Sequence, residues 1–252
     1  MSSEEKEQQR LREWIEESRD TVIFTGAGIS TESGIPDFRS PGGLWAKYQP
    51  IEFSEFMASE ETRREAWRRK FALDETFFQA RPNRGHRAIA KLVNQGRVAV
   101  VITQNIDNLH QESGIDEDTI IELHGNGTYA RCLSCDKRYE LQEIRDSFAI
   151  DQKPPYCSEC KGIIKTAVIS FGQAMPVEAM RRAEEASSGC ELFIAVGSSL
   201  TVYPAAGFPL LAKRRGARLV IVNRDPTQMD SFADLVIHSE IGPTLGAVAG
   251  VG

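Results

Sequence analysis

The chain has 252 residues, of which 41% are hydrophobic and 26% charged, and its net charge is −6. This length allows one large domain or a domain with an insertion, and the composition is that of an ordinary globular protein. The acidic balance gives no electrostatic footprint for nucleic acid, and no apolar run approaches the roughly 20 residues of a membrane-spanning helix, so we expect no direct nucleic-acid or membrane partner.

The first elements are a surface helix and a buried strand. Residues 4–19 carry apolar residues at helical spacing among many charges, and the polar, acidic start is unlike a signal peptide, so we expect a cytoplasmic protein. The apolar run 21–25 predicts a strand, which leads into residues 26–31, Gly-Ala-Gly-Ile-Ser-Thr. Such a glycine turn lets the backbone approach a pyrophosphate, although a plain tight turn is the alternative. The acidic residue expected about 20 positions later is missing, which disfavours an ordinary Rossmann dehydrogenase.

A loop and a helical stretch follow. Residues 34–43 contain no strand signal, and within them Asp37, Phe38 and Arg39 offer a charged pair and an aromatic ring that can close over a ligand. A surface connection with a salt-bridged arginine is the alternative. Residues 52–79 carry aromatic residues at helical spacing, a pattern that is usually part of a core. The next predicted helix, 84–95, contains His86, which we expect to cap or pack.

The stretch from 98 to 125 carries most of the candidate chemistry. The apolar run 98–102 predicts a buried strand, and polar Gln104, Asn105 and Asp107 follow it directly. Because ligands of open parallel sheets bind at the carboxyl ends of strands, these side chains are candidates for ligand contact. His124 ends the next short apolar run, and an imidazole with a pKa of about 6.5 is a natural base. The alternative is that Asp107 caps the next helix and His124 is a core residue.

Four of the five cysteines form two Cys-x-x-Cys pairs, separated by residues 136–156. Two pairs at such a spacing predict a structural zinc site whose four thiolates leave no open position for catalysis. The segment between the pairs has few large apolar residues, so we expect the metal to replace a core. A redox role is the alternative, and the fifth cysteine, Cys190, is expected to be a buried, unreactive thiol. The expected zinc ligands are Cys132, Cys135, Cys157 and Cys160.

The second half of the chain alternates predicted strands with helical stretches, and each strand ends in small or polar residues. The strands are expected at 168–172, 192–196, 219–222 and 235–237, with a helix beginning at Pro176. This alternation is typical of an α/β fold with a doubly wound parallel, Rossmann-like sheet.

Residues 103–110, Thr-Gln-Asn-Ile-Asp-Asn-Leu-His, and residues 122–125, Glu-Leu-His-Gly, resemble the core signature of the sirtuins, the NAD-dependent protein-lysine deacylases. Residues 26–39 and 197–206 resemble NAD-binding segments of that family, and the motifs keep the family's order. The resemblance implies a Rossmann-like domain with a smaller inserted domain, made of a helical module and a zinc ribbon. The expected limits are 1–38, 82–125 and 168–252 for the NAD-binding domain, 39–81 for the helical module and 126–167 for the zinc-binding module.

The resemblance also implies roles for single residues. His124 would take a proton from a ribose hydroxyl, while Asn105 and Asp107 would order the ribose and the nicotinamide pocket. NAD is the expected co-substrate and Zn²⁺ the structural metal. The expected NAD contacts are Gly26, Ala27, Gly28, Asp37, Phe38, Arg39, Gln104, Asn105, Ile106, Asp107, Gly197, Ser198, Ser199, Asn223, Arg224, Asp225 and Ile241.

The implied substrate is an acyl-lysine-bearing protein or peptide, held between the two domains along residues 168–172 by a monomeric enzyme. Family members that prefer succinyl or malonyl groups carry Tyr-x-x-Arg in the helical module. Residues 66–71 contain no tyrosine, so a negatively charged acyl group is not expected. Lys165-Thr166-Ala167 stands where many members have Arg-Pro-x, and Gln173 where many have Glu, so we expect an altered peptide preference. Two alternatives remain, namely an NAD glycohydrolase or ADP-ribosyltransferase, and a non-enzymatic NAD-sensing zinc scaffold.

Overall fold

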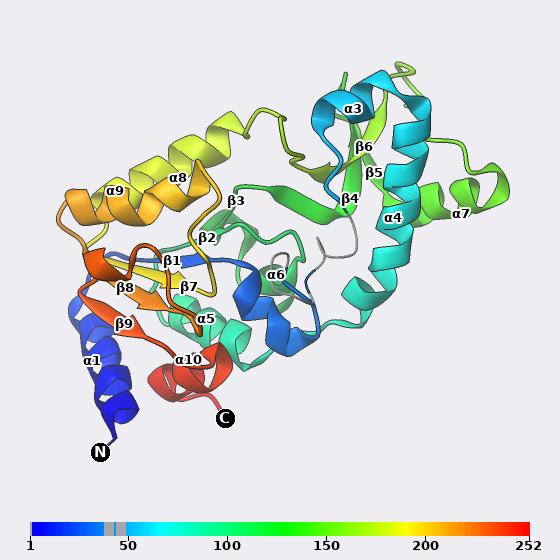
Figure 1. Ribbon diagram of the computed structural model, residues 1–252. Coiled ribbons are helices and arrows are strands. Elements are labelled where there is room, and N and C mark those ends of the chain that lie inside the picture. The colour runs from blue at the N-terminus through cyan, green and yellow to red at the C-terminus, as the bar shows by residue number, and fades with distance from the viewer. Residues whose placement is uncertain (1, 38–42, 44–48) are drawn as a thin grey trace.

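The computed structural model describes residues 2–37, 43 and 49–252, which form a larger and a smaller lobe (Figure 1). The larger lobe is built on a six-stranded parallel sheet with the order β3-β2-β1-β7-β8-β9. Because the strand order runs outward in both directions from β1 and β7, the predicted doubly wound sheet is confirmed. Its strands are β1 (Thr21–Thr25), β2 (Val100–Thr103), β3 (Ile120–Glu122), β7 (Leu192–Val196), β8 (Arg218–Val222) and β9 (Leu235–Ile237).

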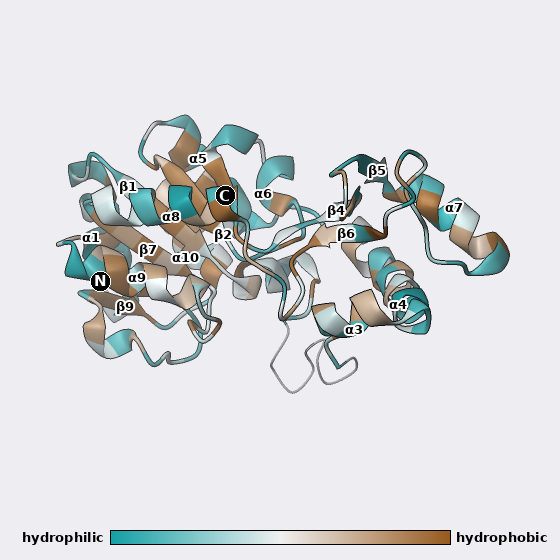
Figure 2. Ribbon diagram, turned by 90° about the horizontal axis from the view of Figure 1, so that it is seen from above, coloured by the Kyte–Doolittle hydropathy of each residue, from teal (hydrophilic) through white to brown (hydrophobic). Residues whose placement is uncertain are grey.

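Helices cover both faces of this sheet, so its central strands are buried on both sides and read as continuous apolar runs. Ile23 and Ile194 pack on one face, whereas Phe24 and Phe193 pack on the other, with their ring centroids 6.1 Å apart. Figure 2 shows many hydrophobic residues among the elements of this lobe. The first face is covered by α1 (Ser3–Glu17), α5 (Arg84–Asn94) and α10 (Ile241–Ala249), the second by α8 (Val177–Gly189) and α9 (Phe208–Arg214).

In the part of the chain that the structure describes, the smaller lobe joins a three-stranded antiparallel sheet, in the order β5-β4-β6, to three helices. The helical stretch predicted at 52–79 is divided at Ser59, whose side chain accepts a hydrogen bond from the Thr62 backbone at 3.2 Å and starts the second helix. The elements are α3 (Phe53–Ala58), α4 (Glu60–Gln79), β4 (Gly125–Cys132), β5 (Arg138–Glu140), α7 (Leu141–Asp151) and β6 (Ile164–Val168).

The expectation that zinc replaces a core in this lobe is wrong, because the lobe has a hydrophobic cluster of its own. Trp67 of α4 is 2% exposed and packs with Ile144 and Phe148 of α7. The Trp67 and Phe71 rings lie 5.5 Å apart, and the Phe71 and Phe148 rings 5.6 Å apart. The few apolar residues between the cysteine pairs suffice because α7 places them on one face, where they meet the aromatic residues of α4.

The strand predicted at 168–172 is also wrong, since β6 ends at Val168, where that strand was expected to begin. Beyond it the chain turns, with the Gln173 backbone N–H donating to the Ser170 carbonyl at 3.0 Å and Gly172 at a φ of +76°. A positive φ is incompatible with an extended strand, so residues 169–172 leave the sheet and form an irregular wall.

The remaining elements are short turns of helix at the ends of strands: η1 (Ala27–Ser33), α6 (Leu109–Glu112), η2 (Glu117–Thr119), η3 (Ala205–Gly207) and η4 (Asp230–Phe232). The chain enters the smaller lobe twice. It passes there between η1 and α3 and returns before α5, and it passes there again between β3 and β4 and returns after β6. The domain limits given above stay a prediction. Within the described part of the chain, every helix is too short or too polar to cross a membrane.

Candidate functional site

The site lies where the strand order reverses, at the carboxyl ends of β1 and β7. The backbone N–H of Gly28 donates to the carbonyl of Gly197 at 2.8 Å, so the two strand-end turns are in direct contact. A Cβ added to Gly26 would lie 2.8 Å from the Gly197 oxygen, and one added to Gly28 would lie 2.8 Å from the Gly197 Cα. Only glycine fits at these two positions, because the backbones of the two turns approach so closely. An open crevice lies above the sheet at this point.

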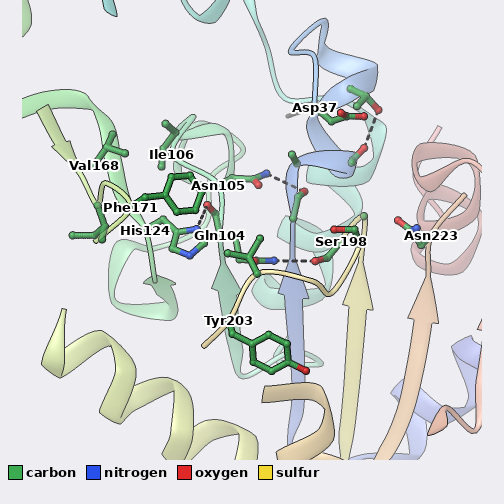
Figure 3. Close-up of a pocket in the computed structure, with 18 of the residues that line it drawn as sticks. Asp37, Gln104, Asn105, Ile106, His124, Val168, Phe171, Ser198, Tyr203 and Asn223 are labelled. Carbon is green, nitrogen blue, oxygen red and sulfur yellow. Dashed lines mark hydrogen bonds between the residues drawn. The ribbon is translucent and has the colours of Figure 1, made fainter. Parts of the chain in front are cut away.

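A cavity of about 650 Å³ occupies this crevice and extends toward the smaller lobe (Figure 3). It is large enough for a small-molecule ligand, and its polar groups come from the strand ends. Most of the residues predicted to contact NAD line it. These are Gly26, Ala27, Gly28, Asp37, Gln104, Asn105, Ile106, Gly197, Ser198, Ser199, Asn223, Arg224, Asp225 and Ile241. His124 lines it as well, whereas Phe38 and Arg39 lie outside the described residues.

His124 presents one ring nitrogen for chemistry. Its Nδ1 lies 3.0 Å from the carbonyl oxygen of Gln104, and because a carbonyl only accepts, Nδ1 carries the proton and Nε2 is left with a lone pair (Figure 3). Burial lowers the pKa of His124 from its ordinary value, and the bond to Gln104 opposes that shift. The imidazole is thus neutral at neutral pH and able to accept a proton.

Asn105 is 7% exposed and is held from two sides. Its Nδ2 donates to the Gly26 carbonyl at 3.2 Å and to the Ser30 hydroxyl at 3.1 Å. Its backbone N–H donates to the Thr103 hydroxyl at 3.0 Å. Both side-chain bonds use the amide nitrogen, so the amide oxygen stays available to a ligand in the cavity.

Asp107 does not line the cavity. It accepts a hydrogen bond from the Ser30 hydroxyl at 2.7 Å and another from the Leu109 backbone at 3.0 Å. Burial raises its pKa, and the bond from Ser30 opposes that shift. Asp107 therefore accepts a hydrogen bond at the start of the next helix, as one of the two predictions for it had it. Its carboxylate also orients the Ser30 hydroxyl, which in turn accepts a hydrogen bond from Asn105. Direct contact between Asp107 and a ligand stays a prediction.

Two further histidines lie beneath this network. His86 takes part in the cap of α5 as predicted, since its Nδ1 accepts from the Asn83 backbone at 3.4 Å. His110 is 1% exposed, and its Nε2 lies 2.9 Å from the Thr25 hydroxyl. Burial lowers the pKa of His86 to about 2 and that of His110 to about 4, so both rings are neutral packing groups.

Several lining residues were not found from the sequence. Tyr203, in the loop after β7, is 67% exposed, and Met175, Ile51 and Glu240 also line the cavity. Phe171, from the irregular wall after β6, lines the cavity as well, and the family resemblance had implied a position along the substrate for residues 168–172 (Figure 3). No local pattern distinguishes these residues from ordinary loop residues, because only the meeting of the two lobes brings them to one cavity.

The four predicted zinc ligands form one cluster at the far end of β4. Their sulfur atoms all lie within 4.8 Å of one another, with 3.5 Å from Cys132 to Cys160 and 3.6 Å from Cys135 to Cys157. A tetrahedral zinc with bonds of about 2.3 Å places its sulfurs about 3.8 Å apart, which this cluster matches. The backbone N–H of Cys160 and the Tyr139 hydroxyl lower the pKa of Cys157 to about 6, which favours the thiolate that zinc binds. None of these cysteines lines the cavity, as expected for a structural metal.

The fifth cysteine, Cys190, is buried, and burial raises its pKa to about 11. A thiol that stays protonated in an apolar environment is a poor nucleophile, so the expectation of an unreactive core residue is confirmed.

Comparison with known proteins gives one consistent result. The model of the Sir2 family matches residues 26–204. The chain is 59% identical to an NAD-dependent protein deacetylase of Rhodopseudomonas palustris over 242 residues, which cover 96% of each protein. It is likewise 59% identical to NAD-dependent protein deacetylase 1 of Bradyrhizobium diazoefficiens over 96% of this chain and 95% of the relative.

Solved structures of Sir2 proteins have the same fold. One, with a deacetylated p53 peptide and 3′-O-acetyl ADP-ribose, superposes with a TM-score of 0.86 at 37% identity and covers 96% of this chain and 97% of the other. Another, with a p53 peptide and NAD⁺, has a TM-score of 0.84 at 37% identity with the same coverage.

Proposed function

The chain belongs to the Sir2 family, and we propose that it removes acyl groups from lysine side chains of proteins at the expense of NAD, using the cavity between its lobes. The observation that carries this proposal is the free Nε2 of His124 on the wall of a cavity that polar strand ends also line. The relatives named as NAD-dependent deacetylases match the chain over nearly its whole length.

In this reaction bound NAD supplies an electrophilic ribose carbon, which accepts the acyl oxygen as nicotinamide leaves. His124 Nε2 accepts the proton of a ribose hydroxyl, so that the hydroxyl oxygen can attack the acyl carbon. Asn105 directs its amide oxygen at the ribose, while Ser30 and Asp107 keep that amide in place. Water then completes the release of free lysine and acyl-ADP-ribose, and the enclosing walls exclude other water from the reacting carbon.

The acyl group is best accommodated if it is neutral and aliphatic. Beside His124 the wall is apolar, formed by Ile106, Val168 and Phe171 (Figure 3). Among the described lining residues the only cation is Arg224, which follows β8 on the opposite side of the switch point. A succinyl or malonyl carboxylate would therefore be buried against apolar side chains without a partner among the described residues, which is unfavourable.

The proposal also includes the cell compartment and the oligomeric state. Four clustered thiols stay available for zinc in a reducing compartment, which supports the cytoplasm. We keep a monomer as the proposed state, and sedimentation of the purified chain at several concentrations would test it.

The decisive experiment compares wild type with His124→Ala on acetyl-, butyryl-, longer-chain and succinyl-lysine peptides, with and without NAD. We expect NAD-dependent release of free lysine and acyl-ADP-ribose from neutral acyl peptides, and loss of turnover in the variant with zinc content unchanged. His238→Ala is the matched control, because His238 also directs Nδ1 at a strand-end carbonyl, at 3.0 Å, but lies outside the cavity.

The products separate the alternatives. Release of free ADP-ribose without an acyl group would instead support the glycohydrolase or ADP-ribosyltransferase alternative. NAD binding without any turnover would support the non-enzymatic sensor. Unchanged turnover in His124→Ala would refute the role of the imidazole. Because burial lowers the pKa of His124, we also expect kcat/KM to fall only below about pH 6.5, where the base becomes protonated.

A further inference from the structure

Lys165 of β6 is an ammonium group in an unusual place. The residue is 4% exposed, and its Nζ donates to the carbonyl of Val168 and lies 6.0 Å from the ring centroid of Phe56. Among the described residues no carboxylate forms an ion pair with it, and burial alone lowers its pKa to about 8. A buried cation without a counter-ion reduces stability, so its presence calls for a gain elsewhere.

Lys165 contacts a peptide unit that also binds the backbone of His124, and this contact can offset the cost of the buried charge. The carbonyl of Val168 and the N–H of Ile169 belong to the same peptide plane and point in opposite directions, because the bond is trans. The Ile169 N–H donates to the backbone carbonyl of His124 at 2.8 Å. Lys165 therefore binds the carbonyl of this peptide unit, while the N–H of the same unit binds the backbone of His124. A charged donor at the carbonyl polarises the peptide and strengthens its N–H as a donor.

The peptide unit between Val168 and Ile169 also lies at the wall of the cavity. Both Val168 and Ile169 line the cavity, and here the chain leaves β6 for the irregular wall that carries Phe171. The ring of His124 is held on its other side by the Gln104 carbonyl. Any shift of the 168–169 peptide thus moves both the wall beside the acyl group and the backbone that carries the base. A displacement of about 1 Å of a catalytic group can cost on the order of a hundredfold in rate.

We propose that Lys165 is a positioning residue for the deacylation reaction, acting through the Val168–Ile169 peptide on His124. The inference rests on the proposed function and adds a residue that does not touch the substrates. A lysine with a purely structural role would instead stabilise the smaller lobe, and its removal would lower stability and activity together.

The test uses the full chain and three variants. Lys165→Met keeps the length and apolar stem and removes the charge, whereas Lys165→Arg keeps a charged donor for the Val168 carbonyl. Lys153→Met is the control, because Lys153 lies in the same lobe with its side chain 75% exposed. The measurements are kcat and KM for an acetyl-lysine peptide and for NAD, thermal unfolding, and zinc content.

For Lys165→Met we expect kcat to fall about tenfold or more, with the KM for NAD and the zinc content unchanged. The melting temperature should stay within about 2 °C of wild type or rise, since relief of the buried charge offsets the lost hydrogen bond. Lys165→Arg should recover most of the lost kcat, and Lys153→Met should match wild type.

Wild-type kcat in Lys165→Met, or equal kcat in the Arg and Met variants, would overturn the inference. A parallel fall of melting temperature and activity would do so too, because it would assign Lys165 a structural role. If wild type itself released no lysine from any acyl peptide, the proposed function would fail first. If wild type is active and Lys165→Met equals it, only this inference fails.

Discussion

Gly197 is the residue on which the geometry of the switch point depends most directly. It follows β7 with a φ of +61°, and a Cβ added there would lie 2.5 Å from the Ile29 nitrogen and 2.8 Å from the Gly28 carbonyl carbon. Both contacts are to backbone, which cannot swing aside as a side chain could. Gly197→Ala should therefore displace η1, the segment that carries the glycine turn of the cavity.

The magnitude follows from two contributions. Placing alanine in the left-handed region costs about 1–2 kcal/mol, and overpacking against a rigid neighbour costs about 1–3 kcal/mol more. The lower entropy of the unfolded alanine chain offsets about 0.4–1 kcal/mol of this. We expect a net loss of about 1–5 kcal/mol in the free energy of unfolding. We also expect a KM for NAD raised roughly tenfold, because the crevice changes shape.

Gly96→Ala is the matched control for this prediction. Gly96 has nearly the same φ, +67°, but nothing lies within 4 Å of an added Cβ, so only the backbone strain remains. Urea unfolding of both variants and NAD titration at saturating peptide would measure the two effects. Equal free energies of unfolding for the two variants, together with an unchanged KM for NAD, would refute the crowding argument.

Three further predictions concern groups away from the reacting atoms. His110, with a folded pKa of about 4 against about 6.5 when unfolded, supports folding above pH 6.5. Up to about 3 kcal/mol of that stability is lost as the pH falls toward 4, and His110→Asn should flatten this dependence in urea unfolding. Cys160→Ala should abolish stoichiometric zinc in elemental analysis and lower peptide turnover. Asp74, 2% exposed, pairs with Lys70 and Arg145, so Asp74→Ala should cost about 3–5 kcal/mol by thermal unfolding, against less than 0.5 kcal/mol for the exposed Glu61→Ala.

Short-range patterns predicted much of the larger lobe. The run Leu192–Val196 was recognised as a strand with its observed limits, because a strand buried on both faces must be continuously apolar. The four zinc cysteines were also predicted from the sequence, because a tetrahedral metal is typically bound by two closely spaced pairs of ligands. The helix 52–79 and the strand 168–172 were placed less well, because Ser59 and Gly172 act through local backbone geometry that residue periodicity does not register.

The chain alone thus specified which residues are apolar, which can bind metal and which polar groups follow strands, because each of these depends on near neighbours. Folding decided which of those groups meet. In the folded chain Gly197 contacts Gly28, and Asp107 binds Ser30 instead of lining the cavity. Lys165 and the backbone of His124 bind the two sides of one peptide unit. Most of these contacts join residues far apart in sequence, and tertiary packing, which no local pattern encodes, determines them.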